Sequence, residues 1–292
     1  MTRRKASVVG ILLVYYPEYF DGSVTRFWRL LRKIHNDAAL VVVCNGSFAP
    51  QTPPTTSAIV LRGDNALREF SGWKVGINHC RNSAAIEADA LFVLANDTFC
   101  HHNKFGPVTE LAFVSAFRHM LAHPNQLAIG GELHGGTTEM RILDKPFRTW
   151  VSTYLVAITS PLLSAIDDLA VPCDMNLFFE RGNAPQPFLT GPLNSALRTH
   201  VENWLFNSAG KSKWYGAGPL TAASRSHFMG KATSILLEMN LAASCAQKGG
   251  VFVSVFGNPF IRQIRRLERL LGMISIRGKR RAQTALVRHD GA

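Results

Sequence analysis

A continuous apolar run near the start of the chain, at residues 8–15, constrains the fold more than any other stretch. It is rich in Val, Ile and Leu, and polar residues do not alternate with them. Strands with one solvated face alternate, whereas strands covered on both faces read as unbroken apolar runs. Sheets covered on both faces are typical of α/β proteins. The run therefore predicts a buried, largely parallel sheet with helices on both sides.

The next hundred residues repeat this kind of strand and place helices between the strands. Apolar runs at 39–44, 59–61 and 90–94 predict three further strands. Apolar residues at helical spacing predict helices at 23–34 and 70–79. This order of elements is typical of a Rossmann-type half-domain. Later runs predict strands at 127–131, 150–157 and 251–256 and helices at 108–123, 193–208 and 228–246.

Basic residues are concentrated at the C-terminal end of the chain. The net charge is +12, and residues 257–292 hold nine Lys or Arg against two acids, a net charge of +7. Phe260, Ile264 and Leu267 begin an apolar face beside these arginines. Basic amphipathic helices bind anionic membrane surfaces. We therefore predict a domain at residues 1–256 and a basic amphipathic segment at 257–292 that binds the inner face of the cell membrane.

Several other signals narrow the class of protein. The five cysteines are widely spaced, with no CxxC pair, which favours a reducing, cytoplasmic location. The basic start and apolar run resemble a signal peptide, but Pro17 follows in place of a small-residue cleavage site, so a first strand is the better interpretation. No apolar run reaches the ~18–20 residues that span a bilayer. The chain has no GxGxxG, Walker A or GxSxG motif.

Polar residues stand where the predicted strands end. The strand at 90–94 is followed by Asn96 and Asp97, and the strand at 39–44 is followed by Asn45. In open α/β sheets, ligands bind at the carboxyl ends of the strands. We therefore predict a ligand site at this edge. Two alternatives are a helix- or turn-capping role for Asp97 and a metal site with His101-His102, which is less favoured because adjacent side chains on a strand diverge.

Several segments in the first 110 residues resemble known transferases. The segments VVGILLVYYP and LVVVCNGS resemble the opening of family-2-type glycosyltransferases with the GT-A fold. The stretch DNALREFSGWKVGI…ALFVLANDTFCHHNKFGP resembles the rhamnan synthesis F-type proteins. The resemblance covers residues 8–110, extends more weakly to 150–166, and is weakest at 200–215. The chain departs from it at Cys44, where the group often has Asp, and at Ala95-Asn96-Asp97, which replaces Asp-x-Asp.

The resemblance implies an α/β fold with a GT-A-like, Rossmann-type mixed sheet flanked by helices and followed by the basic amphipathic helix. It implies an inverting glycosyltransferase that uses a nucleotide-sugar donor. The sugar, for which rhamnose is one candidate, would pass to a surface polysaccharide or lipid-linked glycan. The residues it implies for donor binding are Tyr15, Tyr16, Asn45, Asp64, Asn65, Arg68, Lys74, Asn96 and Asp97.

Metal, base and acceptor roles also follow from the resemblance. Asp97 would hold a divalent cation, Mg²⁺ or Mn²⁺. Because one carboxylate is a small ligand set, a metal-independent site in which Arg68 or Lys74 offsets the diphosphate charge is the alternative. An inverting reaction needs a general base. The candidates for this base are Glu202 first and Glu238 second, and Trp214 and Tyr215 would stack on the acceptor sugar or pack as structural residues.

Two other functional classes stay open. The first is a non-catalytic GT-A-like scaffold, because the second carboxylate of the metal motif is missing. The second is a nucleic-acid-binding or assembly protein that uses the basic segment. Steep salt dependence without any response to nucleotide sugars would favour this second class. The transferase hypothesis expects no nucleic-acid partner.

Overall fold

A seven-stranded mixed sheet forms the centre of the protein. The computed structural model describes residues 5–48, 51–55, 58–101, 105–170, 172, 174–180, 188–206, 216–266 and 268. The strand order is β3-β2-β1-β4-β6-β5-β7. Strands β1 to β4 are parallel, β7 is parallel to β5, and β6 is antiparallel to both of its neighbours. The predicted α/β class with a mixed sheet between helices is confirmed.

The strands are β1 (Ala6–Val14), β2 (Ala38–Cys44), β3 (Ala58–Arg62), β4 (Ile86–Asn96), β5 (Ala128–Ile142), β6 (Lys145–Thr159) and β7 (Val251–Ser254). The α-helices are α1 (Phe20–Ile34), α2 (Glu69–Arg81), α3 (Pro107–Leu121), α4 (Ser160–Ala165), α5 (Asp167–Ala170), α6 (Ser195–Phe206) and α7 (Arg225–Gln247). Short 3₁₀ turns lie at η1 (Pro17–Tyr19), η2 (Asp97–Phe99) and η3 (Met175–Phe178).

The unbroken apolar run at the start of the chain is buried on both faces, as predicted. On one face, Val8 and Leu12 of β1 pack in a cluster with residues of α1 and α3. On the other face, Val9 and Ile11 pack with residues of α2, α4 and α7. Because neighbouring side chains on a strand point to opposite faces, a strand with helices on both sides must be apolar throughout.

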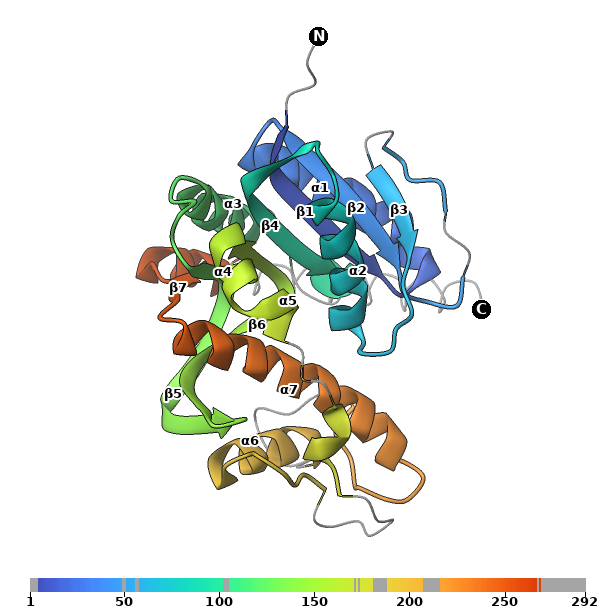
Figure 1. Cartoon of the computed structure of the whole chain (residues 1–292), viewed down its shortest axis with the longest axis vertical. Helices are drawn as coiled ribbons and strands as arrows, with labels where there is room; N and C mark the ends of the chain where they lie inside the picture. The colour runs from blue at the N-terminus through green and yellow to red at the C-terminus, as the bar shows by residue number, and fades with distance from the viewer. Residues whose placement is uncertain are drawn as a thin grey trace, which may run out of the picture.

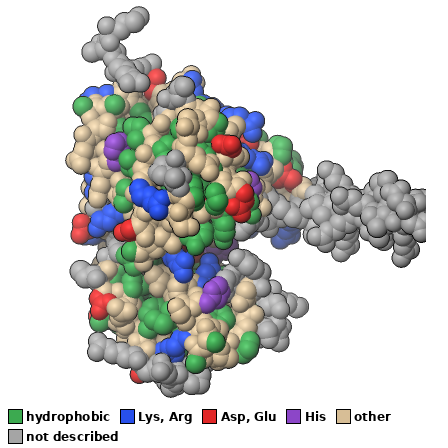
Figure 2. All heavy atoms as spheres, turned by 90° about the vertical axis from the view of Figure 1, so that its right-hand side faces the viewer, with side chains coloured by type: hydrophobic (Ala, Val, Ile, Leu, Met, Phe, Trp, Pro, Cys, Tyr) green, Lys and Arg blue, Asp and Glu red, His purple; other side chains and the backbone are tan. Residues whose placement is uncertain are grey.

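A third core cluster lies below the sheet, where the long β5–β6 hairpin meets α6 and α7. Phe147 of β6, Val201 of α6 and Leu236 of α7 belong to it. Figure 1 shows α7 running across the molecule between the sheet above and α6 below. Figure 2 shows that the surface is hollowed between these upper and lower parts. The carboxyl edge of the sheet faces this lower part of the molecule.

The β5–β6 hairpin is longer than the sequence predicts, because its glycines lie within a strand. A Cβ on Gly130 would come within 2.4 Å of the Met120 Sδ, and one on Gly131 within 2.5 Å of a Val151 methyl group. Glycine therefore allows α3 and the neighbouring strand to pack closely against β5. A pair of adjacent glycines usually indicates a loop, but Gly130 and Gly131 lie within a strand and allow close packing.

The start of the basic segment is helical and packs on the domain. Helix is seen at residues 259–266 and 268. Glu268 accepts hydrogen bonds from the Val108 N–H at 3.0 Å and the Thr109 hydroxyl at 3.2 Å, at the first turn of α3. Arg265 is only 9% exposed, although the prediction placed it among the arginines of a separate membrane-binding segment. The described part of this segment therefore packs against the domain; the rest of the predicted helix lies outside the described residues.

Candidate functional site

Asp97 joins the carboxyl ends of β1 and β4. It lies directly after β4 and is 1% exposed. Its Oδ2 atom accepts hydrogen bonds from the backbone N–H groups of Tyr15 and Tyr16, both at 2.8 Å. A buried carboxylate needs such donors, because an unpaired buried charge is costly. The Tyr15 side chain beside it is 40% exposed, so the end of β1 is open to solvent.

Asn45 connects the end of β2 to the loop before α2. Its side-chain amide donates to the Asn65 Oδ1 atom at 2.8 Å and to the Arg68 carbonyl at 2.9 Å. Its own Oδ1 atom accepts from the Asn65 N–H at 3.0 Å. Asn45 is 3% exposed, so these bonds are sheltered from water. The predicted residues Asn45, Asn65 and Arg68 therefore form one bonded unit.

The loop that follows β3 has an unusual backbone. Asn65 and Arg68 both have φ values of 55°. Asparagine tolerates this region, whereas a long side chain such as arginine rarely adopts it. Backbone strain of this kind is concentrated at functional sites. The Arg68 side chain lies against α7, where a Cβ on Gly230 would come within 2.2 Å of its guanidinium.

Asp64 occupies the same loop and is exposed. Its Oδ1 atom accepts a hydrogen bond from the Ala66 N–H at 2.9 Å. This bond, with help from the Ser71 hydroxyl, lowers the pKa of Asp64 below its ordinary value. Asp64 is therefore a fixed negative charge beside the Asn65–Arg68 turn.

Glu238 lies on α7, on the side of the sheet that α2 covers. Its Oε2 atom accepts two hydrogen bonds from Thr153 of β6, from the backbone N–H and from the hydroxyl, both at 2.8 Å. Two residues away, Leu155 of β6 pairs with Ala95 of β4. Thr153 is therefore level with the carboxyl end of β4, where Asp97 begins η2. Glu238 thus reaches the sheet edge at which the site was predicted.

The environment of Glu238 raises its pKa to about 7. Burial is the main cause, and the two hydrogen bonds from Thr153 oppose it. The charge of Glu69, the first residue of α2, raises the pKa further, and that of Lys231 lowers it. Glu69 also accepts a hydrogen bond from the Ser234 hydroxyl at 3.3 Å. A carboxyl group with this pKa exchanges its proton near neutral pH, as a general base does.

Of the remaining predicted residues that the structure describes, Asn96 lies at this edge of the sheet, as the last residue of β4, whereas Glu202 and Lys74 lie on helices. Glu202 lies on α6, and its Oε1 atom accepts a hydrogen bond from the Leu189 N–H at 3.2 Å. Lys74 is exposed on α2, and Asn96 accepts a bond from the Thr98 hydroxyl at 2.6 Å. Trp214 and Tyr215 lie outside the described residues, as does His102. His101 stacks on Tyr19, with ring centroids 4.1 Å apart.

The described residues provide few ligands for a divalent cation at Asp97. Within the described ranges, no three His, Cys, Asp or Glu side chains form a group that could hold a metal ion. One oxygen of Asp97 accepts two hydrogen bonds from N–H groups, and the side-chain Oδ1 atom of Asn96 accepts one from the Thr98 hydroxyl. Mg²⁺ and Mn²⁺ prefer several hard oxygen ligands. These residues do not by themselves fit a Mg²⁺ or Mn²⁺ site.

Sequence reasoning missed three contributors to this site: Thr153, Ser234 and Lys231. A signal for two of them was present in the sequence. Lys231, Ser234 and Glu238 follow one another at intervals of three and four residues, so they share one face of α7. A polar stripe on a helix that is otherwise largely buried indicates a polar partner. Thr153 gave no such signal within its alternating strand.

The sequence matches no protein-family model and no curated protein. None of the helices in the described residues combines the length and hydropathy needed to cross a membrane.

Proposed function

We propose that the protein is a GT-A-like, inverting glycosyltransferase that uses Glu238 as its general base. The observation that carries the proposal is the pair of hydrogen bonds from Thr153, which hold Glu238 at the carboxyl edge of the sheet. The polar unit of Asn45, Asn65 and Arg68 on the same edge supports a donor site. The mixed sheet, with a polar carboxyl edge, supports the GT-A-like assignment.

In the proposed reaction, Glu238 takes the proton of an acceptor hydroxyl. The hydroxyl oxygen then bonds to the anomeric carbon of the donor sugar as the bond from that carbon to the diphosphate breaks. Positive charge develops at the sugar and negative charge on the departing nucleoside diphosphate. A base with a pKa near the working pH suits this proton transfer. The Asp97 carboxylate holds the Tyr15–Tyr16 backbone in place beside the donor.

Arg68 is proposed to offset the negative charge of the diphosphate. Its strained backbone is held by Asn45, which accepts and donates bonds within the same turn. A fixed guanidinium stabilises developing charge more than a mobile one, because the cost of orienting it is met during folding. Arginine also matches phosphate oxygens with two parallel hydrogen bonds. This role of Arg68 does not require a metal ion.

The first test measures binding of the donor. Thermal stability of the full chain is followed while UDP-, dTDP- and GDP-sugars are added with and without Mn²⁺. A specific nucleotide sugar should raise the melting temperature, because a ligand of the folded state stabilises it. Arg68→Ser should lose most of this shift. No shift with any nucleotide sugar would contradict the proposal and favour the scaffold alternative.

The second test measures transfer and distinguishes the two proposed bases. Release of nucleoside diphosphate from the sugar donor that binds is followed in Glu238→Gln and Glu202→Gln. Loss of a general base costs about 10²–10⁴-fold in rate, and we expect this loss in Glu238→Gln. Asp89→Asn is the control, because Asp89 is exposed near the amino end of β4, away from the site. A large loss in Glu202→Gln with an active Glu238→Gln would refute the assignment of the base.

A further inference from the structure

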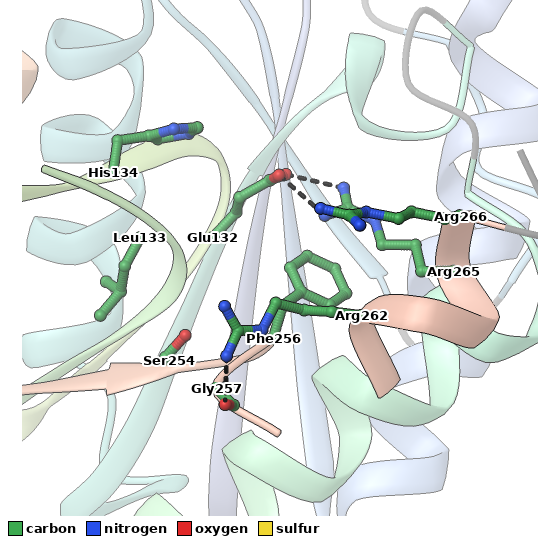
Figure 3. Close-up of a pocket in the computed structure, with 9 residues that line it drawn as sticks. All are labelled: Glu132, Leu133, His134, Ser254, Phe256, Gly257, Arg262, Arg265 and Arg266. Atoms are coloured by element: carbon green, nitrogen blue, oxygen red, sulfur yellow. Dashed lines mark hydrogen bonds and ion pairs between the residues drawn. The ribbon is translucent and has the colours of Figure 1, made fainter. Parts of the chain in front are cut away.

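A separate pocket lies between β5, the end of β7 and the helix at residues 259–266. Its volume is about 340 Å³, enough for on the order of ten waters at ~30 Å³ each. Figure 3 shows Glu132 and His134 on one side of it and Arg265 and Arg266 on the other, while the Arg262 side chain extends from the helix toward Gly257. None of these residues belongs to the proposed donor site.

One ion pair fixes the wall of this pocket. Arg265 donates to both Glu132 carboxylate oxygens, at 2.8 and 2.9 Å. The Tyr154 hydroxyl donates to Glu132 at 2.6 Å, and the Arg265 guanidinium lies 3.5 Å from the centre of the Phe256 ring. The Nε of Arg265 is buried and has no hydrogen-bond partner in the described residues. These contacts hold the helix at residues 259–266 in place, so that Arg266, the next residue, lies beside the cavity.

The charge of the pocket is unbalanced. Glu132 neutralises one of the three arginines, which leaves two positive charges at the lining. The Arg262 guanidinium donates only one hydrogen bond within the described residues, to the Gly257 carbonyl at 3.3 Å. Arg266 is exposed, and its guanidinium forms no hydrogen bond or ion pair with the described part of the chain. His134 lines the same cavity, and partial burial and the nearby Arg265 lower the pKa of its imidazole, while Glu132 raises it.

We propose that this pocket binds a phosphate or diphosphate group between Arg262 and Arg266. Guanidinium groups bind phosphate oxygens in pairs of parallel hydrogen bonds. Two such groups beside a cavity on a fixed helix match the charge and size of a phosphate ester or a diphosphate. The inference does not rest on the proposed glycosyl transfer, because the pocket residues lie apart from Glu238 and Arg68. The group could belong to a soluble ligand or to a lipid head.

The test compares charge-matched variants of the full chain. Binding of inorganic pyrophosphate is measured by calorimetry at constant ionic strength. In Arg262→Ser/Arg266→Ser the dissociation constant should rise about tenfold or more, because charge-assisted hydrogen bonds are lost. The control is Arg29→Ser/Lys248→Ser, which removes the same charge from exposed positions on α1 and after α7. This control should bind pyrophosphate as the unaltered chain does.

Further measurements distinguish a lipid ligand from a soluble one, and binding in this pocket from binding at the proposed donor site. Vesicles of phosphatidylcholine with phosphatidic acid are compared with vesicles containing phosphatidylserine. Binding to phosphatidic acid that the pocket variant loses would support a lipid source. Pyrophosphate binding lost in Arg68→Ser but kept in the pocket variant would assign the anion to the donor site and overturn the proposal. Absence of binding to both pyrophosphate and phosphatidic acid would overturn it equally.

Discussion

Glu238 on α7 accepts hydrogen bonds from both the backbone N–H and the hydroxyl of Thr153, 85 residues earlier in the chain. The neighbour of Thr153 on β6, Tyr154, donates instead to Glu132. Successive strand side chains point to opposite faces. Adjacent residues of β6 therefore support two separate polar sites, the proposed catalytic carboxyl on one face and the arginine pocket on the other.

The hydroxyl of Thr153 should tune the proton affinity of Glu238. A hydrogen bond to a carboxylate stabilises its charged form and lowers its pKa. Glu238 has a pKa of about 7 with this bond in place. If it is the base, kcat/KM should rise with pH and level off above about 7. Thr153→Val keeps the backbone bond and loses the hydroxyl bond, so the rising limb should move to higher pH. If kcat/KM of Thr153→Val rises at the same pH as in the unaltered chain, the ionisation of Glu238 does not control the rate.

Glu238 should also make stability depend on pH. Its pKa is raised from 4.5 in the unfolded chain to about 7 in the folded chain, so the folded chain holds the proton more tightly. The resulting contribution is fully present below about pH 4.5 and is lost as the pH rises through about 7. Glu238→Gln removes this dependence. Relative to the unaltered chain, it should gain roughly 1–3 kcal/mol at pH 8 and little at pH 4.

Urea unfolding at the two pH values measures this difference. Asp89→Asn serves as the control, because Asp89 is exposed and its loss should shift stability little at either pH. A Glu238→Gln variant that is destabilised equally at both pH values would contradict the raised pKa. In that case the role of Glu238 would be structural, as the acceptor of the two hydrogen bonds from Thr153.

Asn45 should hold the donor loop in shape. Asn45→Ala removes three hydrogen bonds and leaves the Asn65 N–H and the Arg68 carbonyl without this partner. We expect a loss of about 2–4 kcal/mol in stability, because buried polar groups left unpaired are costly. Nucleotide-sugar binding should weaken as Arg68 loses its fixed position. Asn78→Ala, at an exposed position on α2, is the control and should be nearly neutral.

The general architecture was predictable because the pattern of apolar residues that indicates each strand or helix lies within that element. The apolar run of β1 (Ala6–Val14) and the periodic apolar face of α1 (Phe20–Ile34) predict their structures from adjacent residues. The placement of Asn45 and Asp97 at one sheet edge was predictable, because parallel strands have their carboxyl ends at the same edge. The two long-range pairs were not predictable. Glu238 meets Thr153, and Arg265 meets Glu132, only after α7 and the final helix have packed on the sheet.

Asp97 should have a structural role that can be separated from any metal role. Asp97→Ala leaves the Tyr15 and Tyr16 N–H groups without the Oδ2 acceptor and should cost about 2–4 kcal/mol. Asp97→Asn keeps an oxygen that can accept these bonds and should fold with a smaller loss. If Asp97 also binds Mn²⁺ with the donor, Asp97→Asn should lose any Mn²⁺-dependent rise in melting temperature. A Mn²⁺ effect that survives in Asp97→Asn would place the metal elsewhere.

The contacts of the final helix predict different results for two shortened chains. A chain that ends at residue 256 lacks Arg265 and Glu268, so Glu132 loses its cation and the first turn of α3 loses its cap. We expect it to lose about 2–4 kcal/mol in stability, because a mostly buried ion pair is broken on one side. A chain that ends at residue 268 keeps these contacts and should unfold like the full chain.

The same two chains separate folding from membrane binding. If residues 269–292 supply the predicted membrane anchor, the chain ending at 268 should remain stable. It should no longer bind vesicles that contain anionic lipid. Each basic residue near such a surface contributes ~1 kcal/mol, and this attraction weakens with salt. Co-sedimentation at low and high salt measures the release. Full retention of the chain ending at 268 on the vesicles would contradict the anchor and leave the Arg262–Arg266 pocket as the candidate lipid contact.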